Sequence, residues 1–207
     1  MGSRGSDRTG EEPADADADL MLRFRQGDAA AFTTLVRSFQ GRVVSLAARY
    51  LGSLADAEDL AQEVFLRVYR ARESYEPTAR FSTWIYRITV NASLNHLRGR
   101  RVRRKITAPL PAVADDGEPA DFADAAALPA DELMEEDELS RVLRTIVDEL
   151  PERQRLALLL NKYEGLSYED TAAAMELTVS AVKSLLTRAR VNVKERLVPY
   201  LEDGAAP

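Results

Sequence analysis

The chain contains no cysteine and only one histidine, His96, among its 207 residues. Disulfide bonds and thiolate metal sites are therefore excluded, and a zinc site built from imidazoles is not expected. No apolar run approaches the ~20 residues that a membrane-spanning helix needs. The polar, acidic N-terminus also lacks the apolar segment of a secretion signal. We therefore expect a cytoplasmic protein with no metal, no cofactor and no membrane contact of its own.

The net charge of −6 and the pI of about 5.0 conceal a segregation of charge along the chain. Residues 77–106 carry eight basic side chains and no acidic one, whereas residues 107–139 carry eleven acidic side chains and no basic one. The local charge is the informative quantity, because a nucleic acid binds a basic patch and not the average of the chain. The acidic pI is therefore compatible with a nucleic-acid partner.

Apolar residues recur at helical spacing, and no segment alternates as a half-buried strand does. Prolines and acidic residues separate two helical stretches, and that composition is too polar to fold alone. The sequence predicts an all-α protein of two small helical domains joined by a flexible acidic linker. The expected boundaries are a disordered acidic tail over residues 1–18, a first domain over 19–106, the linker over 107–137, a helix-turn-helix domain over 138–203 and a tail over 204–207.

Local signals place the helices of the first domain. Helices are expected over residues 20–25, 29–51 and about 54–69, and a fourth is expected to begin at Trp84, capped by Ser82 or Thr83. The breaks coincide with residues that end or cap helices, namely Gly27-Asp28, Gly52, the predicted capping box of Ser53 with Asp56, and Pro77.

The fourth predicted helix carries a polar stripe with a tryptophan at its head. At about 100° per residue, one face holds Trp84, Arg87, Asn91, Asn95 and Arg98, with apolar residues on both flanks. An aromatic ring can stack on an unpaired base, an amide can read a base edge and an arginine can hold a phosphate. A solvated polar stripe is the simpler alternative, but the tryptophan favours contact with single-stranded nucleic acid.

The same helix continues into a basic cluster formed by Arg98, Arg100, Arg101, Arg103, Arg104 and Lys105. Such a density of cations at a helix end is typical of a phosphate-binding surface. The stripe and the start of this cluster, up to Arg101, are therefore the candidate nucleic-acid contacts of the first domain.

The C-terminal part shows a short helix, a tight turn and a longer helix. Ser167, with Asp170 three residues on, caps the short helix over 168–175, and the longer helix is expected over 179–197. This is the helix-turn-helix arrangement, whose second helix enters a major groove. Plain helical hairpins exist too, but the outer face favours duplex DNA, because it presents Ser180, Lys183, Ser184, Thr187, Arg188 and Arg190.

The third helix begins with acidic residues, in the run from Asp56 to Phe65. An ordinary amphipathic helix with acids in its first turn explains this run, because the helix dipole favours them there. The residues alone do not favour a protein-docking surface over that explanation.

Together these segments resemble the extracytoplasmic-function sigma factors, which belong to the sigma-70 family of promoter-specificity subunits of bacterial RNA polymerase. The resemblance covers residues 19 to about 200. Residues 59–65 (DLAQEVF) look like region 2.2, and residues 81–91 (FSTWIYRITVN) look like regions 2.3 and 2.4. The runs LPERQR, GLSYED and VKSLLTRAR, from residue 150 onward, are similar to region 4. Each run is common alone, but their order around an acidic linker is specific.

The resemblance implies partners and roles that the residues alone do not. The third helix would dock on the coiled coil of the polymerase β′ subunit through Asp59, Gln62, Glu63 and Phe65. The fourth helix would recognise the promoter −10 element, and the second domain would recognise the −35 element as duplex. The loop before the fourth helix would hold a base flipped from the duplex, with Ser74, Tyr75, Arg80 and Phe81 as candidates. Core RNA polymerase (its β′ and β subunits), promoter DNA and an anti-sigma factor are the implied partners, and the linker would follow the RNA path.

Two other classes of function are weaker alternatives. A free-standing helix-turn-helix regulator would bind duplex DNA without polymerase, but it has no use for the stripe headed by Trp84. An enzyme is weaker still, because one histidine, no cysteine and no clustered catalytic carboxylates leave nothing to carry a reaction.

Thr187 stands where some relatives carry an aromatic residue, so the −35 sequence cannot be taken from them. We expect a non-catalytic initiation factor that helps to melt promoters.

Overall fold

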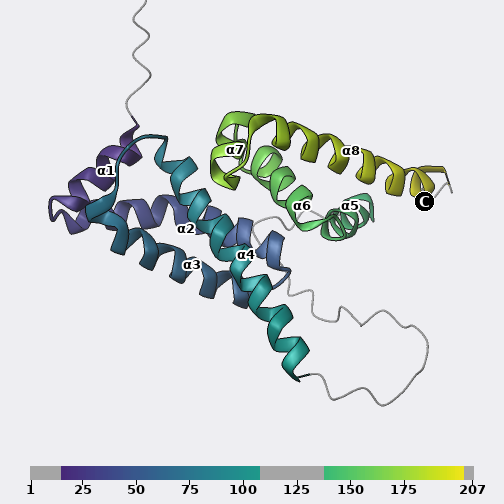
Figure 1. The fold of residues 1–207 in the computed structure, drawn as a ribbon, viewed down its shortest axis with the longest axis horizontal. Helices are drawn as coiled ribbons and strands as arrows, with labels where there is room; N and C mark the ends of the chain where they lie inside the picture. Colours follow the sequence, from purple (N-terminus) through teal and green to yellow (C-terminus); the bar gives the residue numbers. More distant parts are fainter. Residues whose placement is uncertain (1–14, 108–137, 203–207) are drawn as a thin grey trace, which may run out of the picture.

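A computed structural model describes residues 15–107 and 138–202 of the chain, with side chains over residues 15–100 and 138–201. Every regular element in these ranges is a helix, which confirms the predicted all-α class (Figure 1). None of these helices is both long and apolar enough to cross a membrane. Most of the expected tail over 1–18, the linker over 107–137 and the tail over 204–207 lie outside the described residues.

The helices form two modules. The first module comprises α1 (Ala16–Arg25), α2 (Ala29–Leu51), α3 (Leu54–Arg70), a short 3₁₀ turn η1 (Ala71–Ser74) and α4 (Phe81–Thr107). The second module comprises α5 (Glu138–Asp148), α6 (Glu152–Leu158), a π-helical turn η3 (Leu159–Tyr163), α7 (Tyr168–Met175) and α8 (Val179–Glu202).

Helix boundaries with strong local signals lie where the sequence predicts them. The carboxylate of Asp28 accepts hydrogen bonds from the first backbone N–H groups of α2, and Gly52 ends that helix with a left-handed φ of 72°. Ser167 caps α7 by accepting from the N–H of Asp170 at 2.9 Å. In each case a short polar side chain satisfies a donor that the helix leaves free, or a glycine adopts a φ that other residues avoid.

The starts of α1 and α4 differ from the prediction for one shared reason. Asp15 accepts from the N–H groups of Asp17 and Ala18 at 3.1 and 3.3 Å, so α1 begins at Ala16 and not at residue 20. The same carboxylate accepts from the N–H of Phe81 at 2.6 Å, so α4 begins three residues before Trp84. One aspartate thus caps two helices that are distant in sequence, and each cap is worth about 1 kcal/mol.

Three further sequence predictions need correction. Thr83 does not cap α4, because its hydroxyl lies inside the helix and donates to Asp170 of α7 at 2.8 Å. Ser53 caps α3 by accepting from the N–H of Asp56, but the Asp56 carboxylate binds Arg100 of α4 at 2.9 Å and does not complete a capping box. The last helix extends past Leu197 to Glu202 and includes Pro199.

A shared apolar cluster joins the two modules. Buried residues of α2 and α4, such as Leu35, Phe39 and Tyr86, belong to the same cluster as Leu156 and Leu160 of the second module. Among the described residues, a smaller cluster confined to the second module contains the buried residues Ala157, Ala172, Val182 and Leu186. Much of the apolar face of α6 and η3 is therefore covered by the first module.

Candidate nucleic-acid and protein interfaces

The predicted polar stripe lies at the surface of α4. Arg87, Asn95 and Arg98 are exposed, while Trp84 and Asn91 are half-buried. The residues on both flanks are apolar and largely buried, among them Ile85, Tyr86, Val90 and Ala92. The structure therefore brings a ring, two amides and two guanidinium groups together on one accessible face between two anchored flanks.

Trp84 is held by other aromatic rings. Its ring meets Tyr75 edge-on at a centroid distance of 4.9 Å and lies tilted against Phe81 at 5.5 Å. Phe81 in turn packs edge-on against Phe39 of α2 at 5.2 Å. Such pairs fix ring orientation as well as burying area. The indole is thus pre-positioned with one side on the core and its remaining surface open.

The four residues predicted to hold a flipped base, in the loop before α4 and at its first position, differ in their exposure to solvent. Ser74 and Arg80 are exposed, but Tyr75 and Phe81 are only 2% and 0% exposed. Burial raises the pKa of the Tyr75 hydroxyl to about 12, so this side chain is neutral. The structure corrects the assignment of Tyr75 and Phe81, because rings this deeply buried support the loop from below and offer no surface to a base.

The basic cluster at the end of α4 begins with Arg98 and Arg100, whose side chains the structure describes. Arg98 is exposed, and Arg100 is engaged with the carboxylate of Asp56 at 2.9 Å. Arg101 lies in the helix, but its side chain belongs to the part of the chain that the structure does not describe. Of the two side chains of this cluster that the structure describes, that of Arg98 is exposed and continues the stripe.

The second helix of the helix-turn-helix places all six predicted contacts at the surface. Ser180, Lys183, Ser184, Thr187, Arg188 and Arg190 are exposed, whereas Val182, Leu186 and Ala189 are buried beneath them. Tyr168 of α7 orients two of the cations. Its ring lies 5.8 Å from the Lys183 ammonium and its hydroxyl 3.5 Å from Arg190, and that guanidinium lowers the pKa of the Tyr168 hydroxyl.

The outer face of α3 combines acidic, amide and apolar groups. Asp59, Gln62 and Glu63 are exposed, while Phe65 is half-buried against the core of the first module. Two large apolar side chains that were not predicted to belong to this face extend it, because Leu66 and Tyr69 remain 54% and 46% exposed. Leu66 and Tyr69 follow Gln62 by four and seven residues, so the three side chains lie on one face of the helix. This helical spacing is visible in the sequence and could have been used to predict the extended face.

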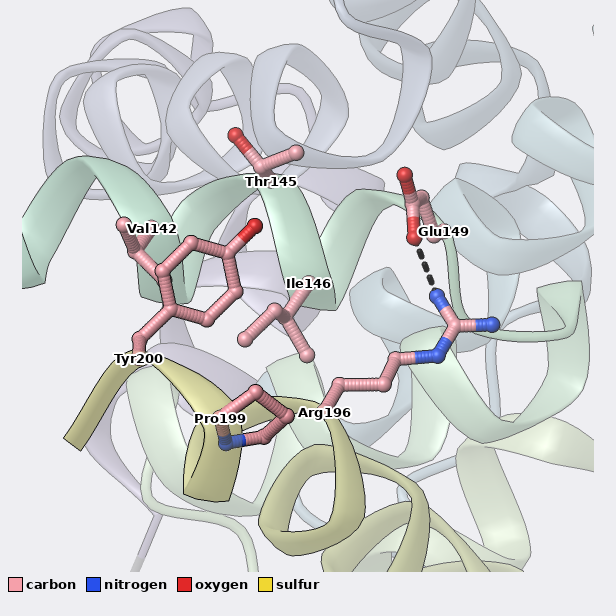
Figure 2. A pocket seen from close by; sticks show the side chains of 7 residues that line it. All are labelled: Val142, Thr145, Ile146, Glu149, Arg196, Pro199 and Tyr200. Carbon is pink, nitrogen blue, oxygen red and sulfur yellow. Dashed lines mark hydrogen bonds and ion pairs between the residues drawn. The ribbon is translucent and has the colours of Figure 1, made fainter. Parts of the chain in front are cut away.

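A groove of about 550 Å³ lies between α5 and the end of α8 (Figure 2). Its walls include Val142, Ile146, Pro199 and Tyr200, and Glu149 forms an ion pair with Arg196 at one side. The paired charges neutralise one another, so this surface lacks the excess positive charge that a phosphate backbone requires. This groove was not predicted from the sequence.

The fold and these surfaces define a class of protein, a two-module helical DNA-binding protein with an additional acidic and apolar face. The family model described as sigma-70 region 2 matches residues 35–103, and the model described as sigma-70, region 4 matches residues 140–193. The two matches fall on the first and second modules.

Curated relatives match over nearly the whole chain. The RNA polymerase sigma-H factor of Pseudomonas aeruginosa is 35% identical over 91% of this chain and 97% of its own length. The ECF RNA polymerase sigma-E factor of Escherichia coli K12 is 36% identical over 89% of this chain and 96% of its own length. The chain belongs to the extracytoplasmic-function sigma factors of the sigma-70 family.

Two solved structures share the fold. CnrH in complex with the cytosolic domain of CnrY is 25% identical, covers 93% of this chain and all of its own, and gives a TM-score of 0.62. The sigma factor RpoE of Bartonella quintana, in complex with the anti-sigma factor NepR, is 25% identical, covers 80% of this chain and 96% of its own, and gives a TM-score of 0.57. The chain is thus an RNA polymerase sigma factor, which acts in transcription initiation, and the free-standing regulator is set aside.

Proposed function

We propose that this sigma factor docks on core RNA polymerase through α3, recognises the −10 element through α4 and the −35 element through α8, and promotes strand opening. The observation that carries the proposal is the presence of three exposed surfaces of different chemistry on one chain. The α4 surface combines an aromatic ring with amides and cations. The α8 surface combines hydroxyl groups with cations, and the α3 surface combines carboxylates with apolar side chains. Each surface fits a different partner of the same initiation complex.

The α4 stripe suits bases that are no longer paired. Trp84 presents the open part of its ring, Asn91 and Asn95 present amides, and Arg87 and Arg98 present cations on the same face. Stacking on an aromatic side chain is worth about 1–3 kcal/mol per base and tolerates any sequence, while amides can discriminate base edges. Duplex DNA keeps its bases stacked, so this arrangement gains energy only after the strands part.

The α8 face suits the major groove of a duplex. Hydroxyls lie near the start of the helix, at Ser180 and Ser184, and the cations Lys183 and Arg188 reach further out. Helix-turn-helix proteins place the N-terminal part of this helix against base edges, where short side chains permit a close approach and long cations reach guanine or phosphate. We assign the −35 element to this face.

The α3 face suits a protein partner. Its exposed carboxylates would repel phosphates, and its exposed leucine and tyrosine would be covered on docking. Arg67 neutralises Glu63 within the helix. The face therefore presents a mixed acidic and apolar surface, which fits the coiled coil of the β′ subunit as the resemblance to the family implies.

Replacing Leu66 by alanine is expected to weaken binding to core polymerase by roughly 5- to 30-fold, because about 1–2 kcal/mol of apolar burial on docking is lost. Folding should be unaffected, since the side chain is 54% exposed. Fluorescence anisotropy of the labelled chain titrated with core enzyme measures the change. Leu201→Ala is the matched control, because Leu201 is an exposed leucine at the end of α8. Equal affinities for Leu66→Ala and the unsubstituted chain would remove α3 from the docking surface.

The proposed activity contains no bond-making step by this chain. Nucleotide addition belongs to the core enzyme, and the sigma factor contributes binding energy for recognition and opening. We place the protein in the cytoplasm, where core polymerase and promoter DNA are found.

We also propose that an anti-sigma factor controls this protein. Leu156, Leu159 and Leu160 form an apolar face of the second module that the first module covers in this structure. When the modules separate, that face and the exposed Leu66 and Tyr69 offer apolar surface to another protein. The Bartonella quintana relative was solved with such an inhibitor bound.

A further inference from the structure

The loop between η1 and α4 is a short exposed segment held between two buried rings. Residues 76–80 are all exposed, whereas Tyr75 before them and Phe81 after them are buried. The centroids of these two rings lie 6.1 Å apart, and the ring of Tyr75 also meets that of Trp84. Both ends of the 76–80 loop therefore rest on the aromatic cluster that holds the head of the polar stripe.

Side chains of α1 restrain both ends of this loop. The guanidinium of Arg25, the last residue of α1, donates to the backbone oxygen of Tyr75 at 3.2 Å. The carboxylate of Asp15, which caps the start of α1, accepts from the backbone N–H of Phe81 at 2.6 Å. Figure 1 shows the segment that leads into α4 passing beside α1, in agreement with these contacts. Helix α1 thus fixes the backbone at the two points where the loop begins and ends.

The two oxygens of Asp15 serve different helices. Oδ1 accepts from the N–H groups of Asp17 and Ala18 and caps α1, whereas Oδ2 accepts from Phe81 and caps α4. A carboxylate offers two acceptor oxygens, but a side-chain amide offers one oxygen and an NH₂ group that only donates. An asparagine would turn its oxygen toward α1, because the opposite orientation sets its NH₂ group against two N–H donors. Asp15→Asn therefore keeps the cap of α1 and loses the bond to Phe81.

The bond to Phe81 fixes the part of the chain that carries the −10 candidates. Phe81 begins the first turn of α4, and the N–H of Trp84 closes that turn on the backbone oxygen of Arg80 at 3.1 Å. Ser74 and Arg80, the two exposed candidates for holding a flipped base, each directly precede a restrained residue. Flipping a base costs stacking and pairing energy, so a site that is already shaped binds the base more tightly than one that must first be ordered. Restraint of the loop ends from α1 therefore favours strand opening.

Resting on the function proposed above, we propose that Asp15 and Arg25 are positioning residues for strand opening. They act through the loop backbone, which they hold in the shape that receives the flipped base. A purely structural role would stabilise the first module and would affect all contacts with the −10 element alike. The proposed role is local, because it concerns the one base position that the loop receives.

An abasic scan of the −10 element tests this role. The full chain bound to core polymerase is titrated with single-stranded −10 oligonucleotides from a promoter that it transcribes, and each base in turn is replaced by an abasic site. The penalty at a position is the ratio of the affinities for the intact and the abasic oligonucleotide. Asp15→Asn should weaken binding of the intact oligonucleotide by about tenfold, as expected for one hydrogen bond to a charged group, and should abolish the penalty at one position only. Arg25→Met should reduce the same penalty by a smaller factor of about threefold, because Arg25 is exposed.

Asp28→Asn is the matched control. Asp28 also caps a helix of the first module through Oδ1, but its Oδ2 pairs with Arg23 at 2.6 Å and not with the loop. This control should leave every penalty unchanged, and the free energy of unfolding of all three variants is measured alongside. Unchanged penalties in both Asp15→Asn and Arg25→Met, or an equal reduction at all positions, would overturn the positioning role. An unsubstituted chain that binds core polymerase but shows no penalty at any position would overturn the function proposed above, and the positioning role with it.

Discussion

Trp84→Ala should slow promoter opening by roughly 5- to 150-fold, because the open strand loses a stacking partner worth about 1–3 kcal/mol. Binding of the −35 duplex should be unchanged, since the helix-turn-helix is untouched. The measurement is fluorescence of a 2-aminopurine placed in the −10 element, followed after mixing with the polymerase holoenzyme. On a template whose −10 region is already unpaired, the variant should recover most of its activity.

A control is needed because Trp84 also packs against Tyr75 and Phe81. Phe39→Leu loosens the same aromatic cluster from its buried side, where no nucleic acid can reach. If this variant slows opening as much as Trp84→Ala at a matched free energy of unfolding, the tryptophan acts through core packing. If Trp84→Ala opens promoters at the normal rate, its assignment to the −10 element is wrong.

Arg188→Ala should weaken binding of a −35 duplex by about 1–3 kcal/mol, or roughly 5- to 150-fold, and relax the preference at one base position. Within the described residues Arg188 is exposed and has no ion-pair partner, so its removal costs the fold little. Competition binding with duplexes that vary one position at a time measures both effects.

Arg196→Ala is the matched control on the same helix. Arg196 carries the same charge two turns further along α8, but its guanidinium pairs with Glu149 of α5 beside the groove in Figure 2. The Arg196→Ala variant should bind the −35 duplex within about twofold of the affinity of the unsubstituted chain, which is the change expected for a distant cation. Comparable losses in the two variants, with no change of base preference, would show that α8 contributes only non-specific charge.

The sequence predicts what depends on neighbouring residues and misses what depends on distant ones. The bounds of α2 and α7 follow from local caps at Asp28, Gly52 and Ser167, and they were predicted correctly. The start of α4 was placed late, because its cap comes from Asp15, which precedes another helix. No local pattern reveals a cap across 66 residues of sequence.

The same distinction applies to the candidate sites. Helical periodicity was sufficient to place the stripe headed by Trp84 and the outer face of α8 at the surface. It was not sufficient for Tyr75 and Phe81, because an aromatic residue in a loop can be exposed or buried according to what the rest of the chain packs against it. The contact of Tyr86 with Glu164 is likewise invisible in the sequence, since it joins residues from different modules.

The central claim is that this chain directs core polymerase to promoters with two elements. Run-off transcription from a randomised promoter pool, with bacterial core polymerase and with or without the chain, tests it most directly. We predict transcripts only when the chain is added, from promoters that share two elements about one and a half to two helical turns apart. Transcripts that do not depend on the chain, or a chain that binds duplex DNA alone yet never supports initiation with a core enzyme it is shown to bind, would contradict the account.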